Sequence, residues 1–86
     1  MAQKKVILVE DEVKLARFVE LELKYEGYEV TVCHDGRDGM TLISQGDFDM
    51  ILLDLMLPGL TGIEICRRVR KTSNVPIIML TAKDEV

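Results

Sequence analysis

The arrangement of apolar and polar residues along the chain predicts four short strands. Three near-continuous apolar runs, each bounded by polar residues, lie at Val6–Val9, Met50–Leu53 and Pro76–Leu80. Apolar runs of this length without alternation are typical of parallel strands that are buried on both faces. The segment Glu29–Cys33 alternates instead and is rich in β-branched residues, which favours a strand at the edge of the sheet.

The segment after the first apolar run predicts a helix. Its second half alternates as a strand would, but Leu, Glu and Lys are good helix formers, and Gly27 supplies a natural stop. We therefore expect an amphipathic helix from Val13 to Glu26. The residues on its inner face would be Leu15, Phe18, Val19 and Leu23.

Two shorter helices are predicted further along the chain. After a turn at Asp35 and Gly36, residues 38–45 form a helix that Gly46 ends. Residues 63–72 form another. Its inward-facing residues would be Ile63, Cys66 and Val69. Strands and helices alternate with short linkers, which predicts an α/β fold with a parallel sheet and helices on its faces.

Length and composition place the chain among small globular domains. It has 86 residues, of which 48% are hydrophobic and 30% charged, so we expect one domain and no global disorder. No apolar run is long enough to span a membrane, and the N-terminus lacks the apolar stretch of a signal peptide. These features predict a cytoplasmic protein without membrane contact. The two cysteines, Cys33 and Cys66, and the single histidine are too few for a zinc site or a disulfide framework, so we interpret the thiols as packing groups.

The net charge of −4 argues against direct binding of nucleic acid by this segment. One basic cluster lies between the apolar runs Met50–Leu53 and Pro76–Leu80, and we interpret it as the solvated face of a helix near its C-terminus, where cations suit the helix dipole. Its members are Arg67, Arg68, Arg70 and Lys71.

Polar side chains that can do chemistry follow the ends of three predicted strands. Residues 10–12 are all acidic, Asp54 follows the third strand, and Thr81 and Ala82 follow the fourth. Taken singly, these residues have structural explanations, such as a helix cap or a turn. Ligands of open α/β sheets bind beyond the carboxyl ends of the strands, where these side chains would converge. Clustered carboxylates repel one another unless a cation lies between them, and Mg²⁺ suits oxygen ligands.

The same strand ends carry motifs that resemble the receiver domain of bacterial two-component response regulators. Residues 6–12 read VILVEDE, residues 52–59 read LLDLMLPG, and residues 78–83 read IMLTAK. The third-strand motif, followed by TGIEICR at residues 61–67, is most similar to regulators that carry a winged-helix DNA-binding domain. The resemblance implies a flavodoxin-like parallel sheet with strand order 2-1-3-4 over residues 1–86.

The resemblance also implies a role for each matched residue. Asp54 would be the phosphoacceptor, modified by the phosphohistidine of a partner sensor histidine kinase. Mg²⁺ would be bound directly by Asp11 and Asp54, by the backbone carbonyl of Met56, and by Glu10 through water.

The resemblance assigns the phosphoryl contacts to the end of the fourth strand. Thr81 would donate a hydrogen bond to a phosphoryl oxygen, and the amide of Ala82 would help to hold the group. The family pattern continues beyond Val86 with a fifth strand, whose lysine pairs with the phosphate. We therefore expect a receiver that is incomplete at its C-terminus.

This expectation has a packing consequence. Parallel crossovers are right-handed, so the first helix would cover one sheet face alone. Apolar residues of Met50–Leu53 and Pro76–Leu80 would then remain exposed, and the fourth strand would be an open edge. We expect such a chain to form dimers or exchange segments.

These residues distinguish three functional classes. A Mg²⁺-dependent phosphatase with an aspartate nucleophile would need a second acid where Met56 stands. A cofactor-binding flavodoxin-like module would need a phosphate loop where residues 10–12 would repel a phosphate. A phosphoacceptor module that controls a transcription-regulating effector domain explains more of the residues. The alternative to a phosphoacceptor module is an engineered or truncated fragment that self-associates and has no phosphotransfer activity. Whether the chain acts as an enzyme stays open.

Overall fold

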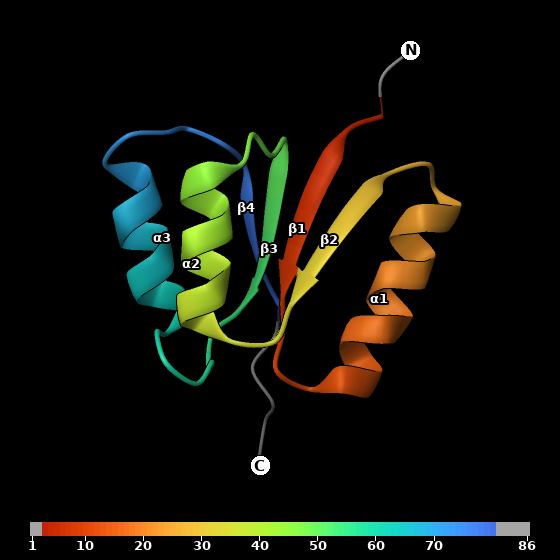
Figure 1. The fold of residues 1–86 in the computed structure, drawn as a ribbon, viewed down its shortest axis with the longest axis horizontal. Helices are drawn as coiled ribbons and strands as arrows, with labels where there is room; N and C mark the ends of the chain where they lie inside the picture. The colour runs from red at the N-terminus through yellow and green to blue at the C-terminus, as the bar shows by residue number, and fades with distance from the viewer. Residues whose placement is uncertain (1–2, 81–86) are drawn as a thin grey trace.

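The computed structural model describes residues 3–80 of the chain. Strands and helices alternate along this part (Figure 1). The strands are β1 (Lys5–Val9), β2 (Glu29–Cys33), β3 (Met50–Asp54) and β4 (Ile77–Leu80). The helices are α1 (Val13–Tyr25), α2 (Gly36–Gln45) and α3 (Gly62–Arg70). The predicted order of elements is confirmed.

The strands form one parallel sheet in the order β2-β1-β3-β4. The chain moves from β1 to β2 in one direction and then crosses back to β3 and β4, so right-handed crossovers place α1 on one face and α2 and α3 on the other. Figure 1 shows α2 and α3 side by side, whereas α1 lies next to β2, away from these two helices. This arrangement confirms the flavodoxin-like fold and the predicted strand order.

The core consists of two apolar clusters, one on each face of the sheet, because alternate residues of each strand point to opposite faces. The cluster under α2 and α3 is the larger one. Its buried members are Ile7, Val9, Cys33, Ile51, Leu53, Leu57, Ile65 and Val69. The buried members of the cluster on the α1 face are Val6, Leu8, Ala16 and Leu52.

Helix α1 buries a face slightly rotated from the predicted one. Ala16 is fully buried, and Val19 and Leu23 pack against the same cluster. These residues are three and four positions apart and therefore lie on one helix face. Phe18, which was expected to face inward, is 61% exposed because it lies outside that stripe.

Helix α3 also differs from prediction in the face that it buries. Ile65 is fully buried and Val69 is 4% exposed, whereas Ile63 is 54% exposed. The prediction that Ile63 faces inward is wrong, because Ile65 and Val69 share one side of the helix and Ile63 lies on the opposite side. Cys66 is half-buried.

Helix α2 begins two residues before the predicted start. Asp35 has an extended backbone, and its Oδ1 accepts hydrogen bonds from the backbone N–H of Arg37 at 2.7 Å and of Asp38 at 3.0 Å. First-turn N–H groups lack partners within a helix, so this capping carboxylate allows the helix to begin at Gly36.

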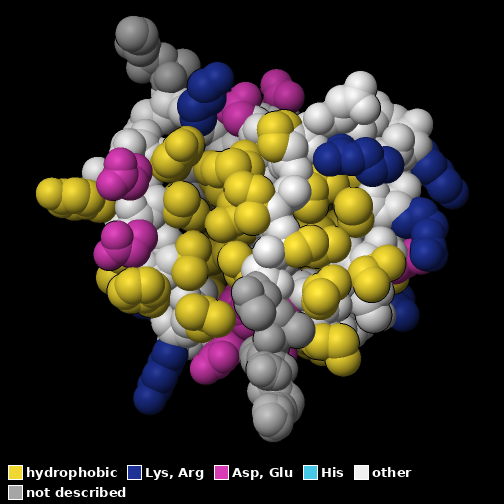
Figure 2. All heavy atoms as spheres, turned by 180° about the vertical axis from the view of Figure 1, so that it is seen from behind, with side chains coloured by type: hydrophobic (Ala, Val, Ile, Leu, Met, Phe, Trp, Pro, Cys, Tyr) yellow, Lys and Arg dark blue, Asp and Glu magenta, His cyan; other side chains and the backbone are white. Residues whose placement is uncertain are grey.

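Strand β4 is much less covered than its apolar sequence predicts. Ile78 is 49% exposed and Met79 is 37% exposed, so the prediction of burial on both faces is wrong for this strand. The expected exposure of apolar residues is confirmed for β4 but not for β3, where Leu52 is only 7% exposed. Figure 2 shows apolar side chains gathered on the side of the molecule opposite to α2 and α3. None of the helices within residues 3–80 has the length and apolar character needed to cross a membrane.

Candidate metal and phosphoryl-transfer site

Three carboxylates meet at the carboxyl end of the two central strands. Glu10 and Asp11 follow β1, and Asp54 is the last residue of β3. One oxygen from each carboxylate lies within 4.8 Å of the others. The sheet register explains this convergence, because Val9 is paired with Leu53 and the next residue of each strand carries an acid. The structure therefore brings together the three acidic side chains that the sequence analysis selected.

Burial makes this group a strong candidate for a cation site. Glu10 is 1% exposed and Asp54 is fully buried, whereas Asp11 is exposed. Desolvation and mutual repulsion both disfavour neighbouring charged carboxylates, and a bound cation relieves both costs. Three oxygen donors, two of them shielded from solvent and one open to it, fit the preference of Mg²⁺ for carboxylates combined with water.

The loop between β1 and α1 holds the carboxylate of Glu10 in place. Its Oε2 accepts a hydrogen bond from the backbone N–H of Glu12 at 2.9 Å. Glu12 is also the residue that precedes α1, and its side chain makes no capping hydrogen bond to that helix. Glu12 rather than Asp11 therefore occupies the N-cap position of α1.

Met56 lies beside Asp54 through its backbone. Its N–H donates to Oδ1 of Asp54 at 3.4 Å, while the Met56 side chain is 68% exposed. The neighbouring Leu57 is 7% exposed and anchors the loop in the core under α2 and α3. A role for Met56 through its main chain, as the resemblance implies, agrees with this placement, and its carbonyl as a metal ligand stays a prediction.

Glycines allow the loop after β3 to pack tightly, whereas the sequence pattern indicated only a turn at Gly36. A side chain at Gly62 would collide with the backbone carbonyl of Asp54. A side chain at Gly36 would collide with the backbone of Leu60. Only glycine therefore allows the starts of α2 and α3 to approach this loop so closely.

His34 contacts the backbone of a site residue, and the sequence motifs did not indicate this contact. Its Nδ1 lies 2.9 Å from the backbone oxygen of Glu10, although the two residues are 24 positions apart in the chain. The signal was not visible in the motifs, because the contact arises from the parallel pairing of β1 and β2. The adjacent Cys33 is buried, and burial raises the pKa of its thiol, with further increases from the charges of Asp38 and Asp35. A protonated thiol agrees with the packing role that we assigned to it.

Two predicted site residues, Thr81 and Ala82, lie outside the described residues. The described part of the chain reaches Leu80, which is the register partner of Asp54 at the end of the sheet. Their phosphoryl contacts stay predictions.

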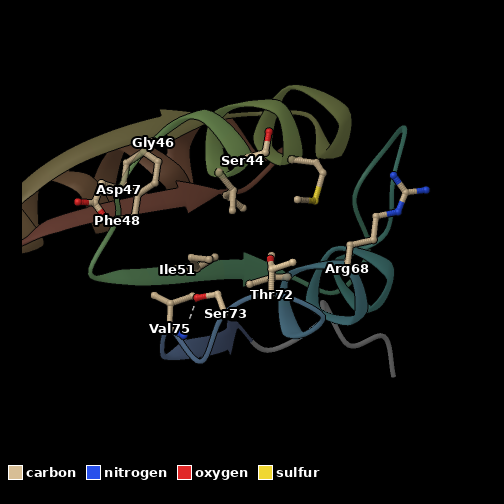
Figure 3. Close-up of a pocket in the computed structure, with 12 residues that line it drawn as sticks. Ser44, Gly46, Asp47, Phe48, Ile51, Arg68, Thr72, Ser73 and Val75 are labelled. Carbon is tan, nitrogen blue, oxygen red and sulfur yellow. Dashed lines mark hydrogen bonds between the residues drawn. The ribbon is translucent and has the colours of Figure 1, made fainter.

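A cavity of about 250 Å³ lies at the opposite end of the molecule, between the C-terminal halves of α2 and α3. Figure 3 shows Ile51 from β3 at its floor, with Ser44 on the α2 side and Thr72 and Val75 on the other. Ile51 is near the start of β3, whereas Asp54 ends that strand. The cavity is therefore separate from the acidic group.

The fold and the acidic group agree with the comparisons with known proteins. Residues 6–86 match the response regulator receiver domain family, and the chain belongs to that family. It is thus a receiver domain of the two-component response regulator class. Sensor histidine kinases phosphorylate domains of this class.

Two curated relatives are similar to the chain over nearly its whole length. It is 51% identical over 82 residues to the uncharacterized transcriptional regulatory protein YkoG of Bacillus subtilis, covering 94% of this chain and 36% of that protein. It is 49% identical over 81 residues to the response regulator ArlR of Staphylococcus saprophyticus, covering 94% of this chain and 37% of that protein. The chain therefore spans just over a third of the length of these relatives.

A solved structure shows the same fold. The response regulator TrrA of Thermotoga maritima, in complex with Mg²⁺-BeF, superimposes with a TM-score of 0.88 at 31% sequence identity, covering 95% of this chain and 72% of that one.

Proposed function

We propose that this chain accepts a phosphoryl group on Asp54 from the phosphohistidine of a sensor histidine kinase. The observation that carries the proposal is the convergence of three carboxylate oxygens within 4.8 Å, two of them on buried residues, at the carboxyl end of the central strands. Membership of the receiver family and the Mg²⁺-BeF complex of TrrA support the same assignment.

The proposed metal ligands follow from the same group. Asp11 and Asp54 bind Mg²⁺ directly, Met56 contributes its backbone carbonyl, and Glu10 acts through water. The ion, when bound, neutralises the carboxylates and the phosphoryl oxygens, which lets the two anionic groups approach. The Met56 N–H, 3.4 Å from Oδ1 of Asp54, helps to orient the nucleophile.

The proposed phosphoryl transfer involves only this chain and the sensor kinase. An oxygen of the Asp54 carboxylate forms a bond to phosphorus while the bond from phosphorus to the kinase histidine nitrogen breaks, and that nitrogen keeps the electron pair. The hydroxyl of Thr81 and the amide of Ala82 donate hydrogen bonds to the phosphoryl oxygens. The product is an acyl phosphate on this chain, so the chain is modified in the reaction rather than turning over a separate substrate.

The output of the modification is proposed from the relatives. YkoG is described as a transcriptional regulatory protein, and this chain matches 36% of its length. We therefore assign control of a transcription-regulating effector domain to the whole protein. We also propose a cytoplasmic location for it. Direct contact with nucleic acid is not assigned to the receiver segment, whose net charge is −4.

The test is modification of Asp54 in the isolated chain. The protein is incubated with Mg²⁺ and acetyl phosphate, and its intact mass is measured together with that of Asp54→Asn. We expect a gain of one phosphoryl group in the unchanged chain, none in the variant, and none when a chelator removes Mg²⁺. An unmodified chain that binds no Mg²⁺ would favour the alternative of a self-associating fragment without phosphotransfer.

Self-association through the edge and face of β4 is a second proposal. Among the described residues this strand is paired on one side only, with β3, and it carries no charged residue that would discourage pairing with another chain. Exposed Ile78 and Met79 add apolar surface to the same edge.

The matched experiment compares Ile78→Lys with Ile63→Lys, because both isoleucines are about half exposed but only Ile78 lies on β4. Light scattering of the 86-residue chain should show dimers or larger species that Ile78→Lys dissociates and Ile63→Lys leaves intact. A monodisperse monomer at high protein concentration would contradict this proposal.

A further inference from the structure

One contact ties the edge strand β2 to the acidic site. Nδ1 of His34 lies 2.9 Å from the backbone oxygen of Glu10. A carbonyl oxygen only accepts hydrogen bonds, so the ring must donate from a protonated Nδ1. On the other side, the backbone N–H of Glu10 donates to the carbonyl of Cys33 at 3.0 Å. Cys33, the last residue of β2, and His34, which follows it, therefore hold both polar groups of the Glu10 backbone.

The position of this carbonyl matters for the next ligand along the chain. The carbonyl of Glu10 and the N–H of Asp11 belong to one planar peptide group, so fixing the carbonyl fixes the plane from which Asp11 departs. Glu10 is additionally held by its buried side chain, which accepts from Glu12 at 2.9 Å. Asp11 is exposed, and the direction of its carboxylate depends more strongly on the backbone that carries it.

The segment that carries His34 also contacts the other loop of the site. The backbone N–H of Gly36 donates to the carbonyl of Pro58 at 2.9 Å. The absence of a side chain at Gly36 lets the backbone of Leu60 pack directly against it. Residues 33–36 therefore contact the loop after β1, which carries Glu10 and Asp11, and the loop after β3, which follows Asp54.

We propose that His34 is a positioning residue of the cation site, which holds the peptide between Glu10 and Asp11 so that both carboxylates face Asp54. The inference rests on the proposed Mg²⁺ site. It requires only a donor at Nδ1, which the neutral Nδ1–H tautomer and the imidazolium both provide. Residues that orient metal ligands typically change metal affinity by about 10- to 100-fold when removed. His34 acts through a backbone group, so we place its effect at the lower end of that range.

The test compares two substitutions at this position. His34→Ala removes the donor, whereas His34→Asn keeps an amide N–H close to the position of Nδ1. Mg²⁺ binding is measured by calorimetry. We expect His34→Ala to weaken Mg²⁺ binding about tenfold and His34→Asn to stay within about twofold of the unchanged chain. Urea denaturation without Mg²⁺ should give similar midpoints for both variants.

The outcomes separate this inference from the function on which it rests. If the unchanged chain binds no Mg²⁺, the proposed cation site itself is wrong. If it binds Mg²⁺ and His34→Ala binds equally well, or His34→Asn is as weak as His34→Ala, only the positioning role is wrong. Should His34→Ala fail to fold, His34→Gln replaces it, because its longer side chain places the amide near Nε2 and should bind Mg²⁺ more weakly than His34→Asn.

Discussion

Strands β3 and β4 carry similar apolar runs but have different surroundings. In β3 every residue from Ile51 to Asp54 is buried, and the strand lies between β1 and β4. In β4 no residue is fully buried, and Ile78 is 49% exposed. The difference shows that an apolar run predicts a strand, while the place of the strand in the sheet decides how much of it is covered.

The same difference explains where the site lies. Asp54, the proposed phosphoacceptor, ends β3, which is packed on both faces. Helices α2 and α3 cover one face of that strand, and the cluster around α1 reaches its other face at Leu52. The edge strand offers a surface for contact rather than a rigid support.

The largest expected effect comes from truncating a buried side chain of β3. Ile51→Ala should lower the free energy of unfolding by about 2–5 kcal/mol, because Ile51 is 1% exposed and a cavity would remain. The matched change on β4, Ile78→Ala, should cost no more than about 0.5 kcal/mol. Urea denaturation at several protein concentrations measures both. Equal losses would show that the two strands are covered alike in solution.

A smaller effect is expected from adding one methyl group where β3 ends. Gly62→Ala would press against the carbonyl of Asp54, and overpacking of this kind costs about 1–3 kcal/mol. The loop after β3 should move, so Mg²⁺ affinity should fall together with stability. A variant with unchanged stability and affinity would show that this end of β3 is not as tightly packed as the structure indicates.

Removing a helix cap should have a smaller effect still. The hydroxyl of Thr61 accepts from the N–H of Glu64 at 3.2 Å and starts α3, which covers β3. Thr61→Ala should lower the free energy of unfolding by about 0.5–2 kcal/mol, and Thr61→Ser should retain most of the cap. Thermal unfolding of the two variants distinguishes loss of the hydroxyl from loss of the methyl group.

The smallest effect concerns the surface of α1, far from β3. Lys24 lies 2.9 Å from Glu20, and its hydrogen bond, with a further one from Arg17, lowers the pKa of the Glu20 carboxyl. A lowered carboxyl pKa stabilises the fold above the unfolded value of about 4.3 and stops doing so as the pH falls through the folded value. Glu20→Gln should cost about 0.3–0.5 kcal/mol at neutral pH because the pairs are exposed.

The pH dependence provides the check on this last prediction. Urea denaturation of the unchanged chain and of Glu20→Gln should give stabilities that converge as the pH falls through the lowered pKa of the folded Glu20 carboxyl. A difference that persists at low pH would point to a packing effect of the side chain instead.

The apolar pattern was sufficient to predict the strands, and the family resemblance supplied their order. The acidic group was predictable because strand ends in a parallel sheet meet at one edge. The sequence was less informative about helix faces. In α3 the prediction placed Ile63 on the buried face, whereas the structure buries Ile65. Both residues are apolar, and only packing against the sheet decides which of them is buried. The contact of His34 with Glu10 was not predictable either, because it depends on the register between β1 and β2.

We propose that the carboxylates of Glu10, Asp11 and Asp54 form one cation site. Calorimetric titration with Mg²⁺ tests this most directly when the unchanged chain is compared with Asp11→Asn and with Asp47→Asn, an exposed acid beside the cavity at the other end of the sheet. We expect one bound Mg²⁺, an affinity reduced by at least about tenfold in Asp11→Asn through the lost ligand charge, and an unchanged affinity in Asp47→Asn. Absence of Mg²⁺ binding, or equal affinities in all three proteins, would contradict it.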